Sequence, residues 1–293
     1  MILRRDDTVL VQGITGKQAS FWTEKMRACG TNIVAGSSPA KAGTEVAGIP
    51  VYDSAIAAAK AHRITCTVLF TPPMATKAAV LDALAAGIRK LVVLAEHVPV
   101  HDVMEFVAAA RDAGAQLVGP NTAGVVTPGE CAVGIMPGFA ENIFQPGSIG
   151  VISRSGSLGT LICLDIVRAG YGESAFIGIG GDPVLGTTTA EALRIFEQDD
   201  KTDAVVIVGE LGGTMEEEAA AYAAATQLSA RKPLVAFIAG RTAPQGRRMG
   251  HAGAIVTGSR GSGESKVRAL RDAGARVLDS PSDVGSVLRN VVS

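Results

Sequence analysis

The sequence predicts an α/β protein built from two doubly wound parallel sheets, and three observations support this prediction. The 293 residues are enough for about two domains, each with its own core. Hydrophobic residues make up 47% of the chain and aromatic residues only 4%, a balance typical of parallel strands that are buried on both faces. Short apolar runs also alternate with helical patterns along the whole length.

The pattern of the first half of the sequence predicts a Rossmann-like domain over residues 1–125. Its apolar runs are expected to form parallel strands at residues 8–12, 32–36, 65–70, 90–94 and 116–119. Helical patterns separate them at residues 21–29, 75–86 and 103–113. Ligands of such sheets bind beyond the carboxyl ends of the strands, so we expect a binding site in the loops that follow them.

The pattern of the second half of the sequence predicts a flavodoxin-like domain over residues 147–293. Residues 126–146 are rich in Pro-Gly turns, and we expect them to form the linker between the domains. Further strands are expected at residues 148–152, 175–179, 204–208, 234–238 and 276–278. Helices are expected between them, at residues 190–197 and 264–273 among others, with a last helix at the end of the chain.

Two loops of the first domain are candidates for binding an anion. The first strand runs into a glycine turn, residues 13–18, and then into a helix, an arrangement that can hold a phosphate at the helix N-terminus. This signal is weak, because plain strand-to-helix connections are equally common. The second strand is followed by Lys41 rather than by the acid of an NAD site, which favours NADP or coenzyme A. A solvated surface lysine explains Lys41 as well.

Three features of the second domain converge on one edge of its predicted sheet. The turn Ser155-Gly156-Ser157 opens a helix, Glu210 follows a strand, and His251 lies in a glycine-rich loop behind two arginines. A helix N-terminus can hold a phosphate, and a carboxylate can orient a histidine that carries it. Two of these features also have a simpler explanation: a connecting loop for His251, and an acid that complements a helix dipole for Glu210.

Composition excludes several other classes of protein. The net charge of −1 favours neither nucleic acid nor an acidic membrane as a partner. The four cysteines form no CxxC pair, which argues against a zinc site and suits a reducing compartment. We expect no secretory signal, because the first residues contain no long apolar core. We expect no membrane span, because no apolar run reaches about 18 residues. A cytoplasmic enzyme without a metal site of its own is the expectation.

Eight ordered motifs give the chain a resemblance to one family over nearly its whole length. They are GITGKQ from Gly13, SPAKAG from Ser38, GPNTAGVVTPGEC from Gly119, GIMPG from Gly134, SRSGSL from Ser153, GIGGDP from Gly178, GELGG from Gly209 and GRRMGHAGAI from Gly246. With this set and spacing the chain resembles the α subunit of succinyl-CoA synthetase, also called succinate–CoA ligase.

The resemblance implies a function and a set of residues. The first domain would bind coenzyme A, His251 would become phosphohistidine, Glu210 would hydrogen-bond its imidazole, and Ser155, Gly156 and Ser157 would hold the phosphate. A partner β subunit with an ATP-grasp fold would bind Mg-NTP, as ATP or GTP, in an αβ or α2β2 assembly acting on a small dicarboxylate in the tricarboxylic acid cycle. The residues that would contact coenzyme A are Thr15, Gly16, Lys17, Gln18, Lys41, Leu94, Ala95 and Glu96.

Departures from the family pattern concern the carboxylate more than the phosphoryl chemistry. Thr122 and Ala123 replace a cysteine and a proline, and Thr160 and Leu161 stand where the family commonly has Tyr-Glu. These changes leave malate–CoA ligase, or a ligase for another small dicarboxylate, as an alternative. Two alternatives from other classes are a non-catalytic CoA-binding protein and an NADP-dependent oxidoreductase.

Overall fold

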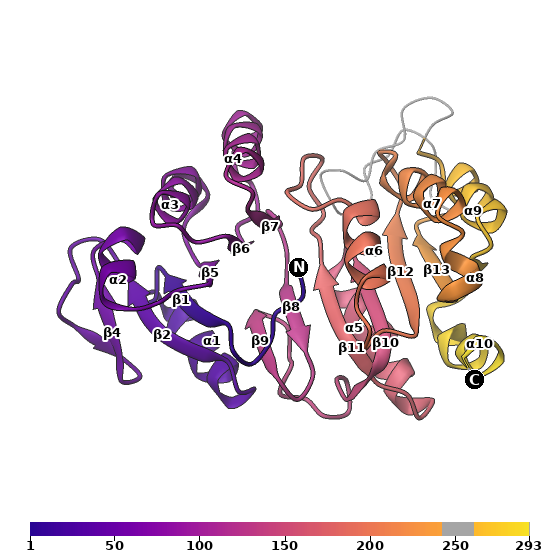
Figure 1. The fold of residues 1–293 in the computed structure, drawn as a ribbon, viewed down its shortest axis with the longest axis horizontal. Helices are drawn as coiled ribbons and strands as arrows, with labels where there is room; N and C mark the ends of the chain where they lie inside the picture. The colour runs from indigo at the N-terminus through magenta and orange to yellow at the C-terminus, as the bar shows by residue number, and fades with distance from the viewer. Residues whose placement is uncertain (242–260, 293) are drawn as a thin grey trace. The chain divides into compact units, whose positions relative to one another are not determined.

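The computed structural model describes residues 1–241 and 261–292, and its contacts divide the chain into two compact units. The first comprises Met1–Phe139 with Val184–Gly186, and the second comprises Ala140–Pro183 with the residues from Thr187 onward. Each unit is an α/β fold, as predicted (Figure 1).

The first unit is built on a seven-stranded sheet in the order β3-β4-β2-β1-β5-β6-β7. Its strands pair in parallel except for the β3–β4 pair. The five strands expected from the sequence are confirmed as β1, β2, β5, β6 and β7, whereas β3 and β4 were not predicted. The bounds are β1 (Thr8–Gln12), β2 (Asn32–Ser37), β3 (Glu45–Val46), β4 (Ile49–Tyr52), β5 (Cys66–Leu69), β6 (Lys90–Val93) and β7 (Gln116–Val118).

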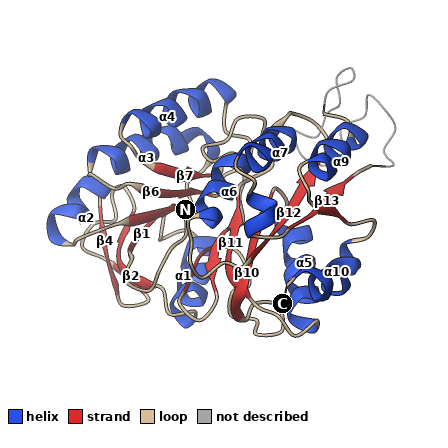
Figure 2. Cartoon of the chain, turned by 45° about the vertical axis from the view of Figure 1, so that its right-hand side comes forward, coloured by secondary structure: helices blue, strands red, loops and turns tan. Residues whose placement is uncertain are grey.

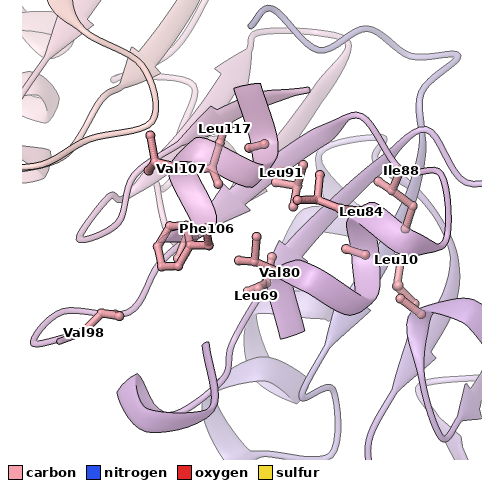
Figure 3. Packing of buried hydrophobic residues seen from close by; sticks show 14 of the residues in the cluster. Leu10, Leu69, Val80, Leu84, Ile88, Leu91, Val98, Phe106, Val107 and Leu117 are labelled. Atoms are coloured by element: carbon pink, nitrogen blue, oxygen red, sulfur yellow. The ribbon is translucent and has the colours of Figure 1, made fainter. Parts of the chain in front are cut away.

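Helices cover both faces of this sheet. In Figure 1, α2 (Ala55–Ala61), α3 (Pro73–Ala85) and α4 (Val100–Asp112) lie on one face, and α1 (Lys17–Ala28) lies on the other. Side chains such as Leu10, Leu69, Leu91 and Phe106 pack between the sheet and the first three of these helices (Figure 3). Helix α1 begins at Lys17, four residues before the expected start, so the predicted binding loop includes its first turn.

An antiparallel hairpin occupies part of the stretch that was expected to be the linker. Its strands are β8 (Gly124–Thr127) and β9 (Cys131–Gly134), and both are buried. A Cβ atom on Gly124 would lie 2.2 Å from the Val133 carbonyl oxygen, so this glycine serves a close approach of two strands. The turn-rich composition that suggested a linker fits a tight hairpin equally well.

The second unit is built on a parallel run of strands in the order β14-β13-β12-β10-β11. All five were expected from the sequence. The strands are β10 (Pro146–Ser153), β11 (Glu173–Gly178), β12 (Ala204–Glu210), β13 (Leu234–Ala239) and β14 (Arg276–Val277). The helices are α5 (Gly156–Arg168), α6 (Thr189–Glu197), α7 (Met215–Ala225), α8 (Leu228–Arg231), α9 (Gly263–Asp272) and α10 (Val284–Val291), with the short η1 (Pro281–Asp283) before the last.

Figure 2 shows α6, α7 and α9 side by side over one face of this sheet, with α5 and α10 together on the other. Helix α5 packs closely because Gly159 has no side chain: a Cβ atom there would lie 2.6 Å from the Phe176 ring. The turn that opens α5 is held at the end of β10 by the Ser153 hydroxyl, which donates to the Ser155 carbonyl at 2.6 Å. Within the described residues, no helix combines the length and the apolar character that crossing a membrane requires.

Candidate active site

The glycine turn after β1 is shaped for close approach of a ligand. Gly13 has a φ of +76°, and a Cβ atom on it would lie 2.7 Å from the Phe70 carbonyl oxygen, so no other residue fits here without strain. Gly16 caps α1 without any side-chain hydrogen bond to the helix. The first N–H groups of α1 can therefore donate to an anion. Thr15, Gly16, Lys17 and Gln18 are all exposed at this helix tip.

The loop after β2 meets this turn directly. The hydroxyl groups of Thr15 and Ser38 lie 2.8 Å apart, and the amide of Lys41 donates to the Ser38 carbonyl at 3.1 Å. Ala40 has a φ of +59°, a left-handed conformation that costs alanine about 1 kcal/mol more than glycine. This turn presents the exposed Lys41 beside the tip of α1.

A cavity of about 480 Å³ opens next to these two loops. Sequence analysis did not identify it, because its lining comes from four separate loops and from α3. Among the lining residues are Gly13, Ser38, Asp53, Thr71, Pro72 and Ala79. The glycine turn, Lys41 and the cavity lie at the carboxyl ends of β1, β2, β4 and β5, where ligands of parallel sheets bind.

The predicted segment Leu94-Ala95-Glu96 follows β6 at the same edge of the sheet. Strand β5 separates it from β1. Leu94 and Ala95 are half-buried and Glu96 is exposed. The Ala95 carbonyl accepts a hydrogen bond of 2.8 Å from the Asn121 amide, which ties this loop to the segment after β7. The loops that hold Thr15 and Ser38 contact each other directly. The loop of Leu94-Ala95-Glu96 shares only the same edge of the sheet with them.

In the second unit, α5 begins at a serine-rich turn. The Ser155 hydroxyl caps the helix by accepting from the Leu158 amide at 3.4 Å, and it lies 3.3 Å from the Ser157 hydroxyl. Gly156 is half-buried and Ser157 is exposed. The amides of the first turn thus lie at a helix N-terminus that an anion can approach, beside two hydroxyl groups that can donate to it.

Glu210 lies on the neighbouring strand and reaches the same turn through an arginine. Strands β10 and β12 pair in parallel, with Ser153 opposite Val208. The guanidinium of Arg154, the residue before Ser155, lies 3.1 Å from Glu210 Oε1 through its Nη2 atom. Both side chains are at least nine-tenths buried. Arg154 was missed in the sequence analysis although it lies inside the SRSGSL motif; its position directly before the helix cap was the available signal.

His251, the predicted phosphohistidine, lies outside the described residues, but both ends of the segment that holds it are described. Strand β13 delivers the chain to Gly240 and Arg241, next to β12. The chain returns at Gly261, whose carbonyl accepts a hydrogen bond of 2.9 Å from the Gly212 amide. The segment therefore departs from and returns to the end of the sheet at which Glu210 lies.

Cysteine chemistry has no support at either site. Cys66 and Cys163 are fully buried, and burial raises the pKa of both thiols well above the usual range. Burial also raises the pKa of Cys131 to about 12. A thiol must lose its proton to act as a nucleophile, so these three are structural side chains.

Comparison with known proteins agrees with the two-part organisation. A family described as a CoA binding domain matches residues 4–97, and one described as CoA-ligase matches residues 152–276. The chain is 49% identical to the ADP-forming sulfoacetate–CoA ligase subunit SqwL of an Acholeplasma species, covering 99% of this chain and 98% of that one. It is 46% identical to a succinate–CoA ligase [ADP-forming] α subunit of Archaeoglobus fulgidus, covering 97% and 96%.

A solved structure shares the fold of the whole chain. ATP citrate lyase from Methanothrix soehngenii, in complex with citrate and coenzyme A, superimposes with a TM-score of 0.90 at 27% identity. The match covers 99% of this chain and 50% of that longer one. Fold and comparisons together define a CoA-binding ligase. The chain belongs to the family of succinate–CoA ligase α subunits.

Proposed function

We propose that this chain is the α subunit of an ADP-forming acid–thiol ligase that works through a phosphohistidine at His251. The observation that carries the proposal is the direct contact of Arg154 with Glu210. It joins a carboxylate suited to orienting an imidazole to a helix N-terminus suited to holding a phosphate. The segment with His251 begins and ends at this edge of the sheet.

The proposed chemistry has three steps. An imidazole nitrogen of His251 attacks the γ-phosphorus of a nucleoside triphosphate, and the diphosphate leaves. A carboxylate oxygen of the acid then attacks the phosphorus, giving an acyl phosphate and restoring the imidazole. The sulfur of coenzyme A finally attacks the acyl carbon, and inorganic phosphate leaves. During the first two steps Glu210 orients the ring, while Ser155, Gly156 and Ser157 donate to the phosphoryl oxygens.

Coenzyme A fits the first unit in this proposal. The cavity beside Gly13 has room for part of the nucleotide, and a side chain at Gly13 would block close approach to its backbone. The uncapped first turn of α1, with Lys17 and Lys41, supplies donors and positive charge for phosphates. In this proposal residues 1–125 form the domain that binds coenzyme A and residues 126–146 form the linker. Residues 147–293 form the domain that carries out phosphoryl transfer.

A partner β subunit with an ATP-grasp fold would supply the nucleotide site with its magnesium ion. Support comes from the relatives, which are named as subunits and as ADP-forming. These names favour ATP over GTP as the phosphoryl donor. Measuring the mass of the complex in solution distinguishes an αβ from an α2β2 assembly.

The acid is proposed to be small and to carry a second anionic group. Relatives at 49% and 47% identity are named for sulfoacetate, and relatives at 46% to 41% for succinate. A sulfonate and a carboxylate share negative charge and short reach, so the class includes succinate, malate and sulfoacetate. A place in the tricarboxylic acid cycle therefore depends on the acid. Thioester formation by the αβ complex with these three, itaconate, citrate and acetate tests the class, and activity with acetate alone would contradict it.

The decisive experiment is phosphorylation of the αβ complex by γ-labelled ATP. We expect a label on the α chain that is stable to base and labile to acid, as a phosphohistidine is. His251→Ala should abolish it and leave coenzyme A binding unchanged, whereas the exposed His101 on α4 provides a matched control, His101→Ala, that should keep the label. An unlabelled wild-type chain that binds coenzyme A would instead support a non-catalytic binding protein.

A further inference from the structure

We infer that a buried chain of alternating charges, Glu210–Arg154–Glu216–Lys266, positions the Glu210 carboxylate for its work on His251. This inference rests on the proposed function. Arg154 and Glu210 are 3% and 9% exposed through their side chains, and Glu216 and Lys266 are completely buried. Ionised groups almost never occur so deep unless each has a partner of opposite charge.

Each link in this series is an ion pair, and the link from Glu216 to Lys266 is also a hydrogen bond. Arg154 Nη2 lies 3.1 Å from Glu210 Oε1, and its Nη1 lies 3.7 Å from Glu216 Oε1. The other oxygen of Glu216 accepts a hydrogen bond from Lys266 Nζ. Glu216 Oε1 also accepts from the backbone amide of Glu210 at 3.2 Å. Glu216 therefore holds both the backbone of Glu210 and the arginine that contacts its carboxylate.

Lys266 anchors the far end of the chain. Its ammonium group donates to Glu216, to Glu217 Oε2 at 2.8 Å and to the Gly213 carbonyl at 3.0 Å. Three acceptors match the three hydrogens of an ammonium group. Gly213 belongs to the turn that follows Glu210, so α9 is tied to that turn as well as to α7.

Four elements are joined in this way at one end of the sheet. Arg154 follows β10, Glu210 ends β12, Glu216 lies in the first turn of α7, and Lys266 lies on α9. Arg154 also stands directly before Ser155, the cap of the helix proposed to hold the phosphate. One rigid connection thus fixes the distance between the helix tip and the carboxylate.

Stability alone is a poor explanation for such a cluster. The desolvation of buried ions offsets much of their attraction, so apolar side chains of similar volume often give equal or greater stability. Partners behind a functional side chain, in contrast, can change activity by about 10- to 100-fold when removed, as the partners of metal-binding side chains do. Arg154, Glu216 and Lys266 are accordingly assigned as positioning residues, which act through Glu210 without touching the reacting atoms.

A double-mutant cycle on the αβ complex tests the assignment. The variants are Arg154→Gln, Glu210→Gln and both together, and the readout is the rate at which γ-labelled ATP phosphorylates His251 in rapid-quench experiments. We expect each single variant to slow phosphorylation by about 10- to 100-fold. The double variant should be no more than about threefold slower than the slower single variant, because Arg154 acts through the side chain that is already changed.

Further variants separate positioning from folding. Arg154→Lys, which keeps the charge, should recover part of the rate lost in Arg154→Gln. The pair Glu216→Gln with Lys266→Met removes the outer link and should slow phosphorylation while leaving coenzyme A binding intact. Lys232→Gln is the matched control, since the ammonium group of this half-buried lysine donates to the Phe196 and Asp199 carbonyls, away from Glu210. Its rate should stay within about twofold of wild type.

Failure of the inference and failure of the proposed function give different results. An unlabelled wild-type α chain overturns both. A labelled wild type in which the effects of Arg154→Gln and Glu210→Gln multiply in the double variant overturns only the positioning role. If the variant without the Glu216 and Lys266 charges phosphorylates at the wild-type rate, then only Arg154 positions Glu210. That result would overturn the part of the inference that concerns Glu216 and Lys266.

Discussion

The hydroxyl groups of Thr15 and Ser38 lie 2.8 Å apart and join the loop after β1 to the loop after β2. The two residues are 23 positions apart in sequence and belong to the two loops that are proposed to hold coenzyme A. Their contact fixes where the tip of α1 lies relative to the turn that presents Lys41. Binding should therefore depend on this hydrogen bond even if neither hydroxyl touches the ligand.

Thr15→Val should weaken coenzyme A binding. A typical hydrogen bond contributes about 1 kcal/mol, so we expect an increase in Kd of about fivefold by calorimetry. Thr226→Val is a matched control, because the Thr226 hydroxyl donates to the Tyr222 carbonyl at the end of α7 in the second unit. Equal affinities for wild type and Thr15→Val would show that the contact does not organise the site.

Lys41→Gln should weaken binding of coenzyme A more than binding of its 3′-dephospho form. The exposed lysine is proposed to face the ribose phosphate, and removing its charge matters only when that phosphate is present. The difference should shrink in high salt because exposed charges are screened. Lys60→Gln, a change at another exposed lysine of the first unit, serves as the control. An equal loss for both ligands would place Lys41 elsewhere on the nucleotide.

Gly209→Ala should impair phosphorylation more than its effect on stability explains. A Cβ atom at this position would lie 2.7 Å from both Cγ and Oε1 of Glu216, so the Glu216 side chain must leave the position in which it pairs with Arg154. Crowding of this kind costs about 1–3 kcal/mol in the free energy of unfolding. Gly170→Ala provides a control of similar stability cost, since Gly170 has a φ of +90° but open space around it. Comparable phosphorylation rates in the two variants would contradict this expectation.

The free energy of unfolding should fall as pH rises from about 4.5 to about 8, through Glu173. Burial raises the pKa of this carboxyl to about 8 from an ordinary value of 4.5, so in this range the folded chain keeps a proton that the unfolded chain loses. The slope from this one group is at most about 1.4 kcal/mol per pH unit. Below pH 4.5 its contribution is fully present.

Glu173→Gln tests this origin, because glutamine resembles the protonated acid and can still accept from the Gln145 amide, which donates to Glu173 at 3.1 Å. Its Tm relative to wild type should therefore increase steadily between pH 5 and pH 8. The exposed Glu24 supplies a control in Glu24→Gln, for which no such trend is expected. A constant difference in Tm across the range would rule out Glu173 as the source.

Periodicity predicted the parallel strands because each is a short apolar run buried on both faces, as Val9, Leu10 and Val11 are. The elements that were missed have weaker signals. Strand β3 consists of two residues, and the β8–β9 hairpin hides its pattern among glycines and prolines. Helix α8 is a single turn whose preceding residue, Gln227, has a positive φ that sequence does not reveal.

Residues of the candidate site were predictable where they follow a strand and share its edge. Ser155 and Glu210 were found in this way. The partners behind them were not, because Glu216 and Lys266 look like ordinary charges on helix surfaces. Only the packing of α7 against α9 turns both side chains inward. The cavity beside Gly13 was missed for a related reason: its walls are assembled from loops that are distant in sequence.

The Gly212 amide donates to the Gly261 carbonyl, so Gly261 is held at the turn that follows β12. After Gly261, β14 pairs with β13 and Lys266 is held by two glutamates. The part of the chain from Gly261 onward is therefore held to the second unit by non-covalent contacts as well as by its covalent connection. Two pieces produced separately, one ending at Arg241 and the other starting at Gly261, should therefore associate with each other.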